Sequence, residues 1–425
     1  MSGRADDIAW WKVLAALARG RAPGQTVIQY TDVCNATCAQ CGMSRVHRRT
    51  RHTLTPSAVR GLLDRLAARG TMAVSFTGGE PLLFLDEITY CIRYARDIGI
   101  PSVRTGSNGF FFQGSDKPGF LNKVARYACA LAASGCTTFW ISLDSADPAV
   151  HEANRGLPGM IDGLAKGLRV FHEHGLRPAV NLGLNRNIGG ITPRPEAETP
   201  DQAVARYQAA FRRYFDFALE LGFTAANVCY PMTRAQFETD GVVYEAAAEV
   251  DWMQFSDVEL AALYDALYTT LPEYRHRMHI FTPRCALLSM MHRLRGQPGQ
   301  AYPCRGGRDF FFVDAAGMQF YPCGYRGQES APDPDTLARA AAKAGPCSRC
   351  DWECFRDPST LFGPILEFFR NPLRLLGRIC ADPEWMRAWL GDLANMRACG
   401  WFDARKPFQQ RQRPEGSAQR PDTPA

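Results

Sequence analysis

Alternating strand-like and helical segments predict an α/β protein: a partial (β/α)6 TIM-like barrel with a small cysteine-rich C-terminal β-hairpin/α domain. Over most of the first 284 residues, six apolar runs of strand length are separated by helical patterns. This alternation is typical of parallel strands with covering helices. Ligands bind at the carboxyl ends of the strands in such folds. The strands are expected at residues 27–31, 73–77, 102–105, 138–144, 179–184 and 227–230.

Composition sets broad limits on function. The chain has 425 residues, of which 46% are hydrophobic and 22% charged, and a net charge of +6. This suits a globular protein with one large and one smaller domain. No basic block is strong enough to predict nucleic-acid binding, and no uninterrupted apolar run reaches the roughly 18 residues of a membrane-spanning helix. Asp6, Asp7 and Lys12 around the first apolar segment favour an amphipathic surface helix over a secretion signal.

The pattern of the chain changes near residue 300. Residues 309–314 and 318–321 are two strand-like runs on either side of a turn that contains Gly317, which predicts a β-hairpin. The last residues are polar and rich in Gln, Arg and Pro, which predicts disorder. The expected division is an N-terminal amphipathic helix (1–24), the barrel (25–284), the cysteine-rich domain (285–358), a C-terminal helical segment (359–407) and a disordered tail (408–425).

Three cysteines follow the first strand at once, in the pattern Cys34-x3-Cys38-x2-Cys41. Three thiolates on one loop can hold three corners of a cube-like iron–sulfur cluster and leave one iron open to a small molecule. A structural zinc site is the alternative, but zinc takes four ligands and no fourth one is nearby in the sequence. The clustering of the fifteen cysteines fits reduced thiols and metal better than disulfides.

A second group of cysteines surrounds the predicted hairpin. Its members are Cys304, Cys323, Cys347, Cys350 and Cys354. They predict a second metal site. Structural zinc stays an open alternative here, because a C-x2-C pair with two further cysteines is a common zinc pattern.

Polar and glycine-rich motifs follow the next three strands. The second strand runs into Gly78-Gly79-Glu80-Pro81, the third into Gly106-Ser107-Asn108, and the fourth ends in Ser142-Leu143-Asp144. Because these ends meet at one edge of a parallel sheet, we expect one site there. Ser142 and Asp144 could instead cap a helix, and His151 is expected to be a surface helix residue.

With these motifs in order, residues 25–355 resemble the radical S-adenosylmethionine (radical SAM) superfamily. The strand end at Asp144, with His151 and Arg155-Gly156 beyond it, is also similar to that family. The resemblance implies a 4Fe–4S cluster on Cys34, Cys38 and Cys41, whose fourth iron chelates the amino and carboxylate groups of SAM. One electron would then cleave SAM to methionine and a 5′-deoxyadenosyl radical, which removes a hydrogen atom from the substrate.

The resemblance also implies contacts to SAM. The expected residues are Gly78, Gly79, Glu80, Ser107, Asn108, Ser142, Asp144 and Arg155. The two glycines would let the backbone approach the methionine part, Glu80 would accept from its ammonium group, and Arg155 would pair with its carboxylate. The other four would hydrogen-bond the ribose or the methionyl carboxylate side. Gln40 departs from the family, which has an aromatic residue before the third cysteine, so adenine packing would rely on other groups such as Met43.

The cysteine-rich domain resembles the SPASM extension, or the shorter Twitch form, of radical SAM enzymes. Five cysteines imply one auxiliary iron–sulfur cluster, of the 4Fe–4S type, and are closer to Twitch than to the longer form, which holds two. Cys304, Cys323, Cys347 and Cys350 suffice for it. Cys354 is a fifth candidate that could replace one of them.

The implied protein is a cytoplasmic radical SAM oxidoreductase or maturase that acts on a peptide or small metabolite. It would need an external one-electron donor such as flavodoxin or ferredoxin. No catalytic side chain is assigned from the sequence, and nucleic acid is not an expected partner. The basic run at residues 45–52 is expected to be a solvated loop, with guidance of an anionic substrate as the alternative.

Two other functions remain open. The first is action on a lipid or prenyl chain at a membrane surface, because residues 361–379 are apolar and place Arg370, Arg374 and Arg378 on one helical face. Pro372 favours instead a broken helix packed on the barrel. The second is a non-catalytic iron–sulfur scaffold or electron carrier, which would have no need of the Gly-Gly-Glu motif.

Overall fold

The structure is a computed structural model of the whole chain. It describes residues 10–43, 51–191, 197–232, 241–244, 250–297, 302–345, 347–348, 350–400, 403, 405 and 408. Two predictions therefore lie mostly outside the described residues: the basic loop at 45–52, of which only residues 51 and 52 are described, and the tail from 408 onward.

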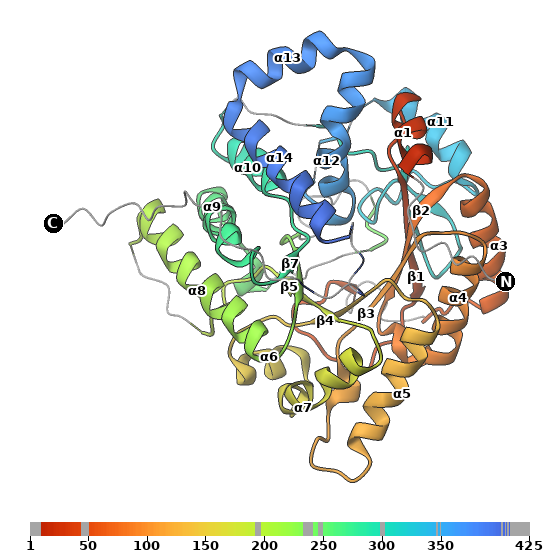
Figure 1. Cartoon of the computed structure of the whole chain (residues 1–425), viewed down its shortest axis with the longest axis vertical. Helices are drawn as coiled ribbons and strands as arrows, with labels where there is room; N and C mark the ends of the chain where they lie inside the picture. The colour runs from red at the N-terminus through yellow and green to blue at the C-terminus, as the bar shows by residue number, and fades with distance from the viewer. Residues whose placement is uncertain are drawn as a thin grey trace.

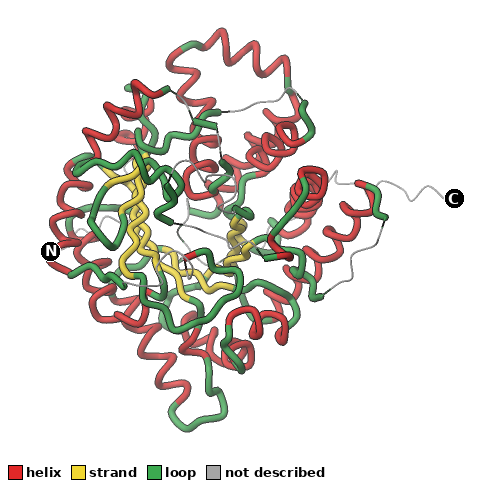
Figure 2. Tube along the Cα trace, turned by 180° about the vertical axis from the view of Figure 1, so that it is seen from behind, coloured by secondary structure: helices red, strands yellow, loops and turns green. Residues whose placement is uncertain are grey.

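Among the described residues, nine strands form one sheet in the order β7-β6-β5-β4-β3-β2-β1-β8-β9. Their bounds are β1 Gly24–Thr31, β2 Thr71–Gly78, β3 Ser102–Ser107, β4 Thr138–Ser142, β5 Ala179–Gly183, β6 Ala225–Cys229, β7 His279–Ile280, β8 Phe310–Val313 and β9 Phe320–Tyr321. Neighbours from β1 to β7 all pair in parallel. The described strands form an open, curved layer (Figure 2). The predicted α/β fold with a partial barrel is confirmed.

Helices cover the outer, convex side of this layer (Figure 1). Those of the barrel are α3 Pro56–Ala68, α4 Leu85–Asp97, α5 Phe120–Ala133, α6 Pro148–Arg155, α7 Met160–Glu173, α8 Pro200–Glu220 and α9 Asp257–Tyr274. The main core lies between them and the sheet; Leu62 and Leu63 of α3, for example, share it with Val74 and Phe76 of β2. Alternate side chains of the strands therefore face the helices, and the others face the concave side of the sheet.

Helix α3 shows how the local sequence sets an element. Thr55 accepts a hydrogen bond from the backbone N–H of Ala58, and Pro56 occupies the first turn of the helix. The helix buries Val59, Leu62, Leu63 and Leu66, which recur at helical spacing. These residues form one apolar face of α3, which packs against the sheet.

The predicted hairpin is present but does not stand apart from the barrel. β8 and β9 pair antiparallel, and β8 pairs in parallel with β1, from Gln25 opposite Phe310 to Ile28 opposite Val313. All four residues of β8 are buried, which explains why this apolar run joins the middle of a sheet. The cysteine-rich segment is thus built onto the barrel sheet.

The C-terminal part is helical. The remaining helices are α1 Trp10–Ala18, α10 Arg284–Leu294, α11 Pro334–Ala344, α12 Glu353–Arg370, α13 Pro372–Ala381 and α14 Pro383–Ala398. The expected domain boundary at 358 falls inside the continuous helix α12. The predicted break at Pro372 is confirmed, since α13 starts there with Asn371 as its N-cap. Within the described residues, no helix has the length and apolarity needed to cross a membrane.

Candidate functional site

The loop of Cys34, Cys38 and Cys41 leaves the carboxyl end of β1. Cys34 is an exposed residue and Cys38 and Cys41 are partly exposed, so a ligand can reach the loop. Asn108 donates from Nδ2 to the Cys34 Sγ at 3.8 Å and to Asn35 Oδ1 at 3.0 Å. The loop is therefore linked to the end of β3.

The three thiols are close enough to affect one another's protonation. Burial raises the pKa of Cys38 to about 12; Arg155 lowers this pKa, while Asp144, Cys41 and Cys34 raise it further. Burial also raises the pKa of Cys34, and Cys41 adds to that rise. Crowded, accessible thiols of this kind fit an iron–sulfur cluster, which is held by Cys thiolates. Among the described residues, no three His, Cys, Asp or Glu side chains are arranged to hold a metal ion, so the ligand roles stay predictions.

Gly78 and Gly79 pack directly against the cysteine loop. A Cβ on Gly78 would meet the Thr31 carbonyl oxygen at 2.1 Å, and one on Gly79 would meet that of Val33 at 2.2 Å. The Gly79 N–H donates to Thr31 at 2.7 Å, and the Glu80 N–H donates to Val33 at 2.8 Å. The two glycines thus allow the end of β2 to support the start of the cysteine loop, a role that the sequence did not indicate.

Glu80 is buried, with 1% of its surface exposed. Its carboxylate accepts hydrogen bonds from the Leu82 N–H at 3.0 Å and the Asn108 N–H at 2.7 Å. Burial raises its pKa to about 7, although these hydrogen bonds and Arg155 act in the opposite direction. Glu80 therefore joins the ends of β2 and β3.

Ser107 and Asn108 shape the turn after β3. The Ser107 hydroxyl accepts from the Gly109 N–H at 3.0 Å, and the Asn108 side-chain oxygen accepts from the Phe110 N–H at 2.9 Å. Both side chains thus make local hydrogen bonds at the strand end where the sequence placed them. Their expected contacts to SAM stay predictions.

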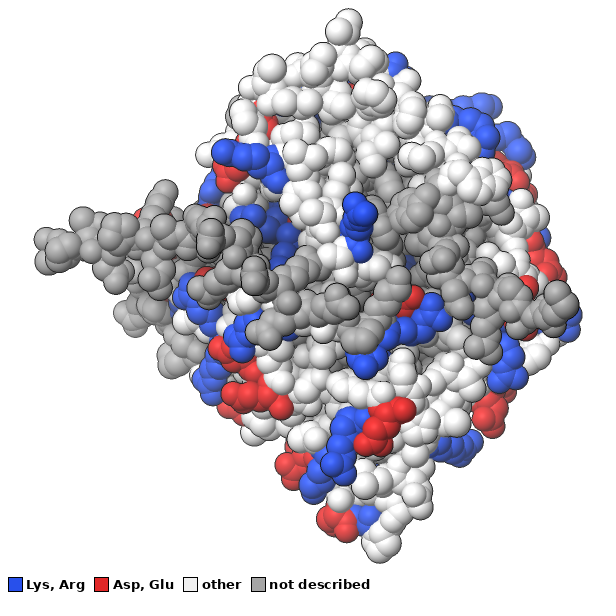
Figure 3. All heavy atoms as spheres, viewed as in Figure 1, with Lys and Arg blue, Asp and Glu red and all other residues white. Residues whose placement is uncertain are grey.

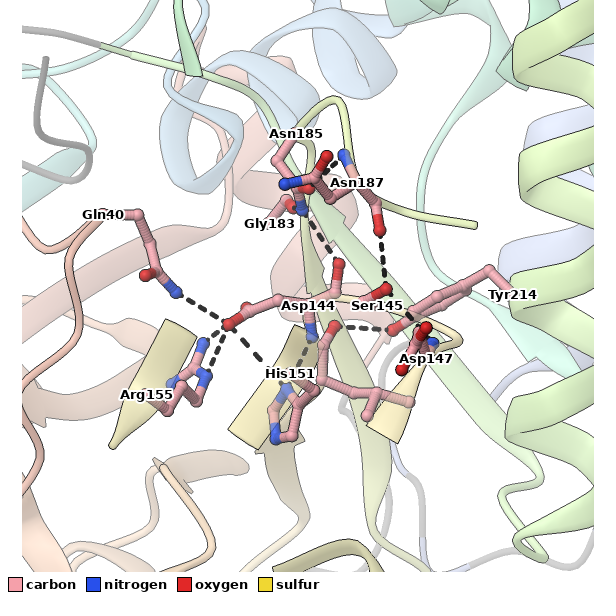
Figure 4. A network of polar contacts seen from close by, with 11 residues as sticks. Gln40, Asp144, Ser145, Asp147, His151, Arg155, Gly183, Asn185, Asn187 and Tyr214 are labelled. Carbon is pink, nitrogen blue, oxygen red and sulfur yellow. Dashed lines mark hydrogen bonds and ion pairs between the residues drawn. The ribbon is translucent and has the colours of Figure 1, made fainter. Parts of the chain in front are cut away.

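Asp144 and Arg155 form a bidentate ion pair beside the cysteine loop (Figure 4). Arg155 donates from Nε at 2.8 Å and from Nη2 at 2.7 Å to the two oxygens of Asp144. Burial raises the pKa of Asp144, but the guanidinium outweighs it and the net shift is downward. The guanidinium of Arg155 is thus already paired with Asp144, and its expected contact to the carboxylate of SAM stays a prediction.

Gln40 joins the same network from the loop. Its Nε2 donates to Asp144 Oδ2 at 2.7 Å (Figure 4). The residue that departs from the family pattern therefore connects the cysteine loop to the end of β4. Its placement between two cysteines was the available signal, but in the sequence Gln40 stood out only as the missing aromatic residue.

Helix α6 holds the other side of the loop. The N–H groups of Thr37 and Ala39 donate to the carbonyls of Arg155 and Asn154, at 3.2 and 3.1 Å. Gly156 ends the helix with φ +64°, and a Cβ there would meet the Thr37 hydroxyl at 2.3 Å. A left-handed glycine therefore lets this helix end contact the loop.

The prediction that His151 lies on the surface is wrong. The imidazole has no exposed surface, and its Nδ1 accepts from the Asp144 N–H at 3.1 Å. Burial lowers its pKa to about 4. His151 is therefore neutral, with its proton on Nε2, and helps to hold the backbone of Asp144.

The concave face of the sheet carries polar side chains that the sequence reading did not single out. Asn227 Nδ2 donates to Asn181 Oδ1 at 2.9 Å, and the Cys229 thiol donates to the same oxygen at 3.4 Å. In β4, β5 and β6 these alternate positions, Ser142 among them, are partly exposed while their neighbours are buried. The single Asn in the middle of each of these otherwise apolar strands, β5 and β6, was the available signal.

Trp140 and Arg104 extend this face toward β3. The Trp140 indole covers Gly106, where a Cβ would lie 2.1 Å from the ring. The Arg104 guanidinium lies 5.7 Å from the Trp140 ring centroid. The concave side therefore combines an aromatic surface with a buried cation.

Four of the five C-terminal cysteines gather at the amino ends of β1 and β8. The Cys304 N–H donates to the Cys347 carbonyl at 2.7 Å. Cys304 precedes β8, and Cys323 follows β9, which runs antiparallel to it. Burial raises the pKa of Cys350 to about 12, and Cys304 and Cys347 add to this rise. Burial also raises the pKa of Cys323, with Cys350 and Cys304 as the charges that add to it.

Cys354 has different neighbours. Its thiol donates to Glu353 Oε1 at 3.5 Å, and its carbonyl accepts from Gln25 Nε2 at 3.0 Å. The charges that shift its pKa are Glu353, Arg104 and Asp357, after burial, which raises it most. The first turn of α12 thus places Cys354 near the concave face, on the Arg104 side.

Residues 28–195 match the family model of the radical SAM superfamily. The chain carries a radical SAM domain over these residues. As a radical SAM protein it is an enzyme that uses SAM and a 4Fe–4S cluster, and it needs a reductant and a substrate.

Several relatives are known by name. The chain is 24% identical over 310 residues to the AdoMet-dependent heme synthase of Methanosarcina barkeri (strain Fusaro / DSM 804), which covers 73% of this chain and 79% of that protein. It is 29% identical over 172 residues to the GTP 3′,8-cyclase of Vibrio cholerae serotype O1 (strain M66-2). The aligned residues cover 39% of this chain and 46% of that protein. A solved structure described as native anSMEcpe with bound AdoMet and Kp18Cys peptide has a TM-score of 0.50 and 14% identity, and covers 83% of this chain and 98% of that one. This likeness supports the fold alone.

Proposed function

We propose that Cys34, Cys38 and Cys41 hold the 4Fe–4S cluster of this radical SAM enzyme and that the substrate binds on the concave face of the sheet. The observation that carries this proposal is the support of the three-thiol loop. Hydrogen bonds join it to the end of β2, to Asn108 after β3 and to the last carbonyls of α6. A loop held from three sides can present its sulfur atoms in a fixed arrangement.

When bound, the cluster and SAM supply one-electron chemistry that can remove a hydrogen atom from an unactivated C–H bond. The protein's own charges support the thiolate ligands. Arg155 lies near Cys38, and its positive charge lowers the pKa of that thiol and so favours the thiolate. Asp144 and Gln40 keep the guanidinium and the loop in place.

The Gly78-Gly79-Glu80 segment, Ser107, Asn108, Ser142 and Asp144 would border SAM at the same sheet edge. Because Glu80 and Asn108 also hold the strand ends together, substituting either would affect the shape of the site as well as binding. Electrons would come from an external donor such as flavodoxin or ferredoxin.

The substrate is proposed to be a peptide or a small metabolite. Asn181, Asn227 and Cys229 offer hydrogen-bonding groups on the concave face, which suits a polar substrate better than a lipid or prenyl chain. The similarity to AdoMet-dependent heme synthases makes tetrapyrroles the first small metabolites to test.

We further propose one auxiliary iron–sulfur cluster on Cys304, Cys323, Cys347 and Cys350. These four share electrostatic neighbours, whereas Cys354 lies beside Glu353 and Arg104. We therefore expect that Cys354 is not a ligand of the auxiliary cluster.

Turnover tests the enzyme directly. Protein purified without oxygen, reduced with dithionite and given SAM, is expected to release 5′-deoxyadenosine, faster with the correct substrate pool. Peptide, tetrapyrrole and lipid fractions of cell extract are compared side by side. If no fraction supports 5′-deoxyadenosine release, the chain is an iron–sulfur scaffold or electron carrier.

Iron content tests the two ligand sets. The double variant Cys34→Ala/Cys38→Ala should lose one cluster's iron, and Cys350→Ala should lose the other. Cys354→Ala should keep the iron of both. A loss of iron in Cys354→Ala equal to that in Cys350→Ala would show that Cys354 is a ligand, and stoichiometric zinc would argue for a structural site.

A further inference from the structure

The end of α12 and the helix α13 expose large apolar side chains at one extremity of the molecule, here called the apolar cap. It consists of Phe368, Phe369, Leu373, Leu376 and Ile379, whose exposed fractions are 54%, 45%, 77%, 56% and 36%. α13 has no buried residue. It projects at the top of Figure 1, where Figure 3 shows mainly uncharged atoms.

Two arginines of α13 pair with the end of α12. Arg374 and Arg378 both pair with Glu367 of α12, at 3.1 and 3.0 Å. The Arg378 guanidinium also lies 4.8 Å from the ring centroid of Tyr302. A helix that merely covered the protein would bury its leucines and expose its arginines. α13 instead turns most of its large apolar side chains outward and Arg378, with 21% of its side chain exposed, inward, while Arg374 is 67% exposed beside Glu367.

We propose that the apolar cap inserts into the interfacial region of an anionic lipid bilayer. The cap is a projecting helix with no acidic residue from Phe368 to Ala381 and with an exposed arginine, Arg370, beside its aromatic pair. Basic amphipathic helices with exposed Phe and Leu bind bilayers in this way, and nearby cations attract anionic lipid. Arginine side chains can extend their charge to the headgroups while their stems stay apolar.

A second amphipathic helix supports the same partner. α1 packs against α12 and exposes Trp11 by 69% and Leu14 by 54%. Trp is enriched at membrane interfaces because its ring is amphipathic. Two helices from opposite ends of the chain thus expose apolar side chains in one region of the molecule. The inference does not depend on the proposed function, since none of these residues belongs to the strand-end site.

Flotation with vesicles tests the proposal on the full chain. Vesicles of phosphatidylcholine alone are compared with vesicles that contain about 30% phosphatidylglycerol, an anionic lipid. Wild-type protein should float with the anionic vesicles, and roughly tenfold less of the Leu373→Ser/Leu376→Ser variant should do so. Arg370→Glu should weaken anionic binding several-fold. Arg374 and Arg378 are left unchanged because they hold α13 in place.

The matched control is Leu121→Ser/Val258→Ser, which replaces side chains exposed by 43% and 63% on other helices. It should float like the wild type. All variants should unfold at the wild-type denaturant midpoint and form 5′-deoxyadenosine at the wild-type rate without lipid, which separates this test from that of the proposed function.

Two results would overturn the proposal. One is equal flotation of the wild type and Leu373→Ser/Leu376→Ser. The other is a wild-type dimer in solution that the same variant converts to a monomer, because the cap would then be an interface between two copies of the chain.

Discussion

At the scale of single residues, the Asp144–Arg155 pair concentrates charge beside the cysteine loop. Asp144 exposes 5% of its side chain and Arg155 exposes 14%. Removing one partner of such a pair leaves the other charge buried without compensation, which is the costly case. The pair therefore matters more for stability than a surface ion pair of similar geometry.

Asp144→Asn should lower the free energy of unfolding by roughly 3–5 kcal/mol, because it leaves the Arg155 guanidinium uncompensated. Urea unfolding of the metal-free protein measures this. The matched control is Glu273→Gln, which breaks an equally short pair with Arg212 whose side chains are 40% and 47% exposed. That change should cost at most about 1 kcal/mol. Equal losses in the two variants would contradict the prediction.

Glu80 makes stability depend on pH. Its pKa is raised in the folded state from 4.5 to about 7. Between these values the folded protein binds more protons than the unfolded chain, so stability falls as pH rises. The contribution is complete below pH 4.5 and is lost as pH passes about 7.

The free energy of unfolding of the wild type should decrease between pH 5 and pH 8. In Glu80→Gln this decrease should be smaller by roughly 3 kcal/mol, because the variant lacks the carboxyl group. The measurement is the free energy of unfolding at both pH values for the wild type and the variant. His151→Asn serves as the comparison, because the folded-state pKa of His151 is lowered to about 4. Wild-type His151 lowers the free energy of unfolding as the pH falls below 6.5, whereas Glu80 lowers it as the pH rises.

At the scale of elements, the strand ends depend on close backbone contacts. β2 can approach the cysteine loop only because Gly79 lacks a side chain. The sequence predicted the alternation of strands and helices, the six barrel strands and the position of the motifs, because periodicity and the placement of glycines are local signals. It did not reveal which partner the glycines face or that His151 is buried, because both depend on contacts between distant segments.

Gly79→Ala should displace the cysteine loop, because its methyl group would overlap the Val33 carbonyl at 2.2 Å. We expect a loss of about half of the bound iron after reconstitution and a destabilisation of roughly 2 kcal/mol. Gly61→Ala is the control, since nothing lies within 4 Å of a Cβ there and the residue lies within α3. It should be neutral or stabilising by up to about 1 kcal/mol. Full iron content in Gly79→Ala would show that the loop can shift without loss.

At the scale of the whole molecule, β8 completes the sheet on the side of β1. The partner strands are separated by almost the full barrel in sequence, from Gln25 to Phe310. No local pattern in the sequence encodes such a pairing, which is why a separate small domain was predicted. The sequence signal that β8 lies inside a larger sheet was its four consecutive apolar residues, all of which are buried in the structure.

A chain that ends after Gln297 should self-associate, because it lacks β8 and leaves the edge of β1 unpaired. Size-exclusion chromatography with light scattering should show oligomers or aggregates. A chain that ends after residue 408 retains all described strands and should elute as the full-length protein does. A monomeric 1–297 fragment would contradict the prediction.

The parallel pairing of β1 and β8 also places the two cysteine groups at opposite ends of this strand pair. The loop of Cys34, Cys38 and Cys41 follows the carboxyl end of β1, whereas Cys304 and Cys323 lie beyond the opposite end of this strand pair. β1 has eight residues, so roughly 25 Å of strand separates the two groups. A substrate on the concave face would lie between them. If both groups carry clusters, electrons that enter at one end and leave at the other would travel past the substrate, along the axis of the barrel.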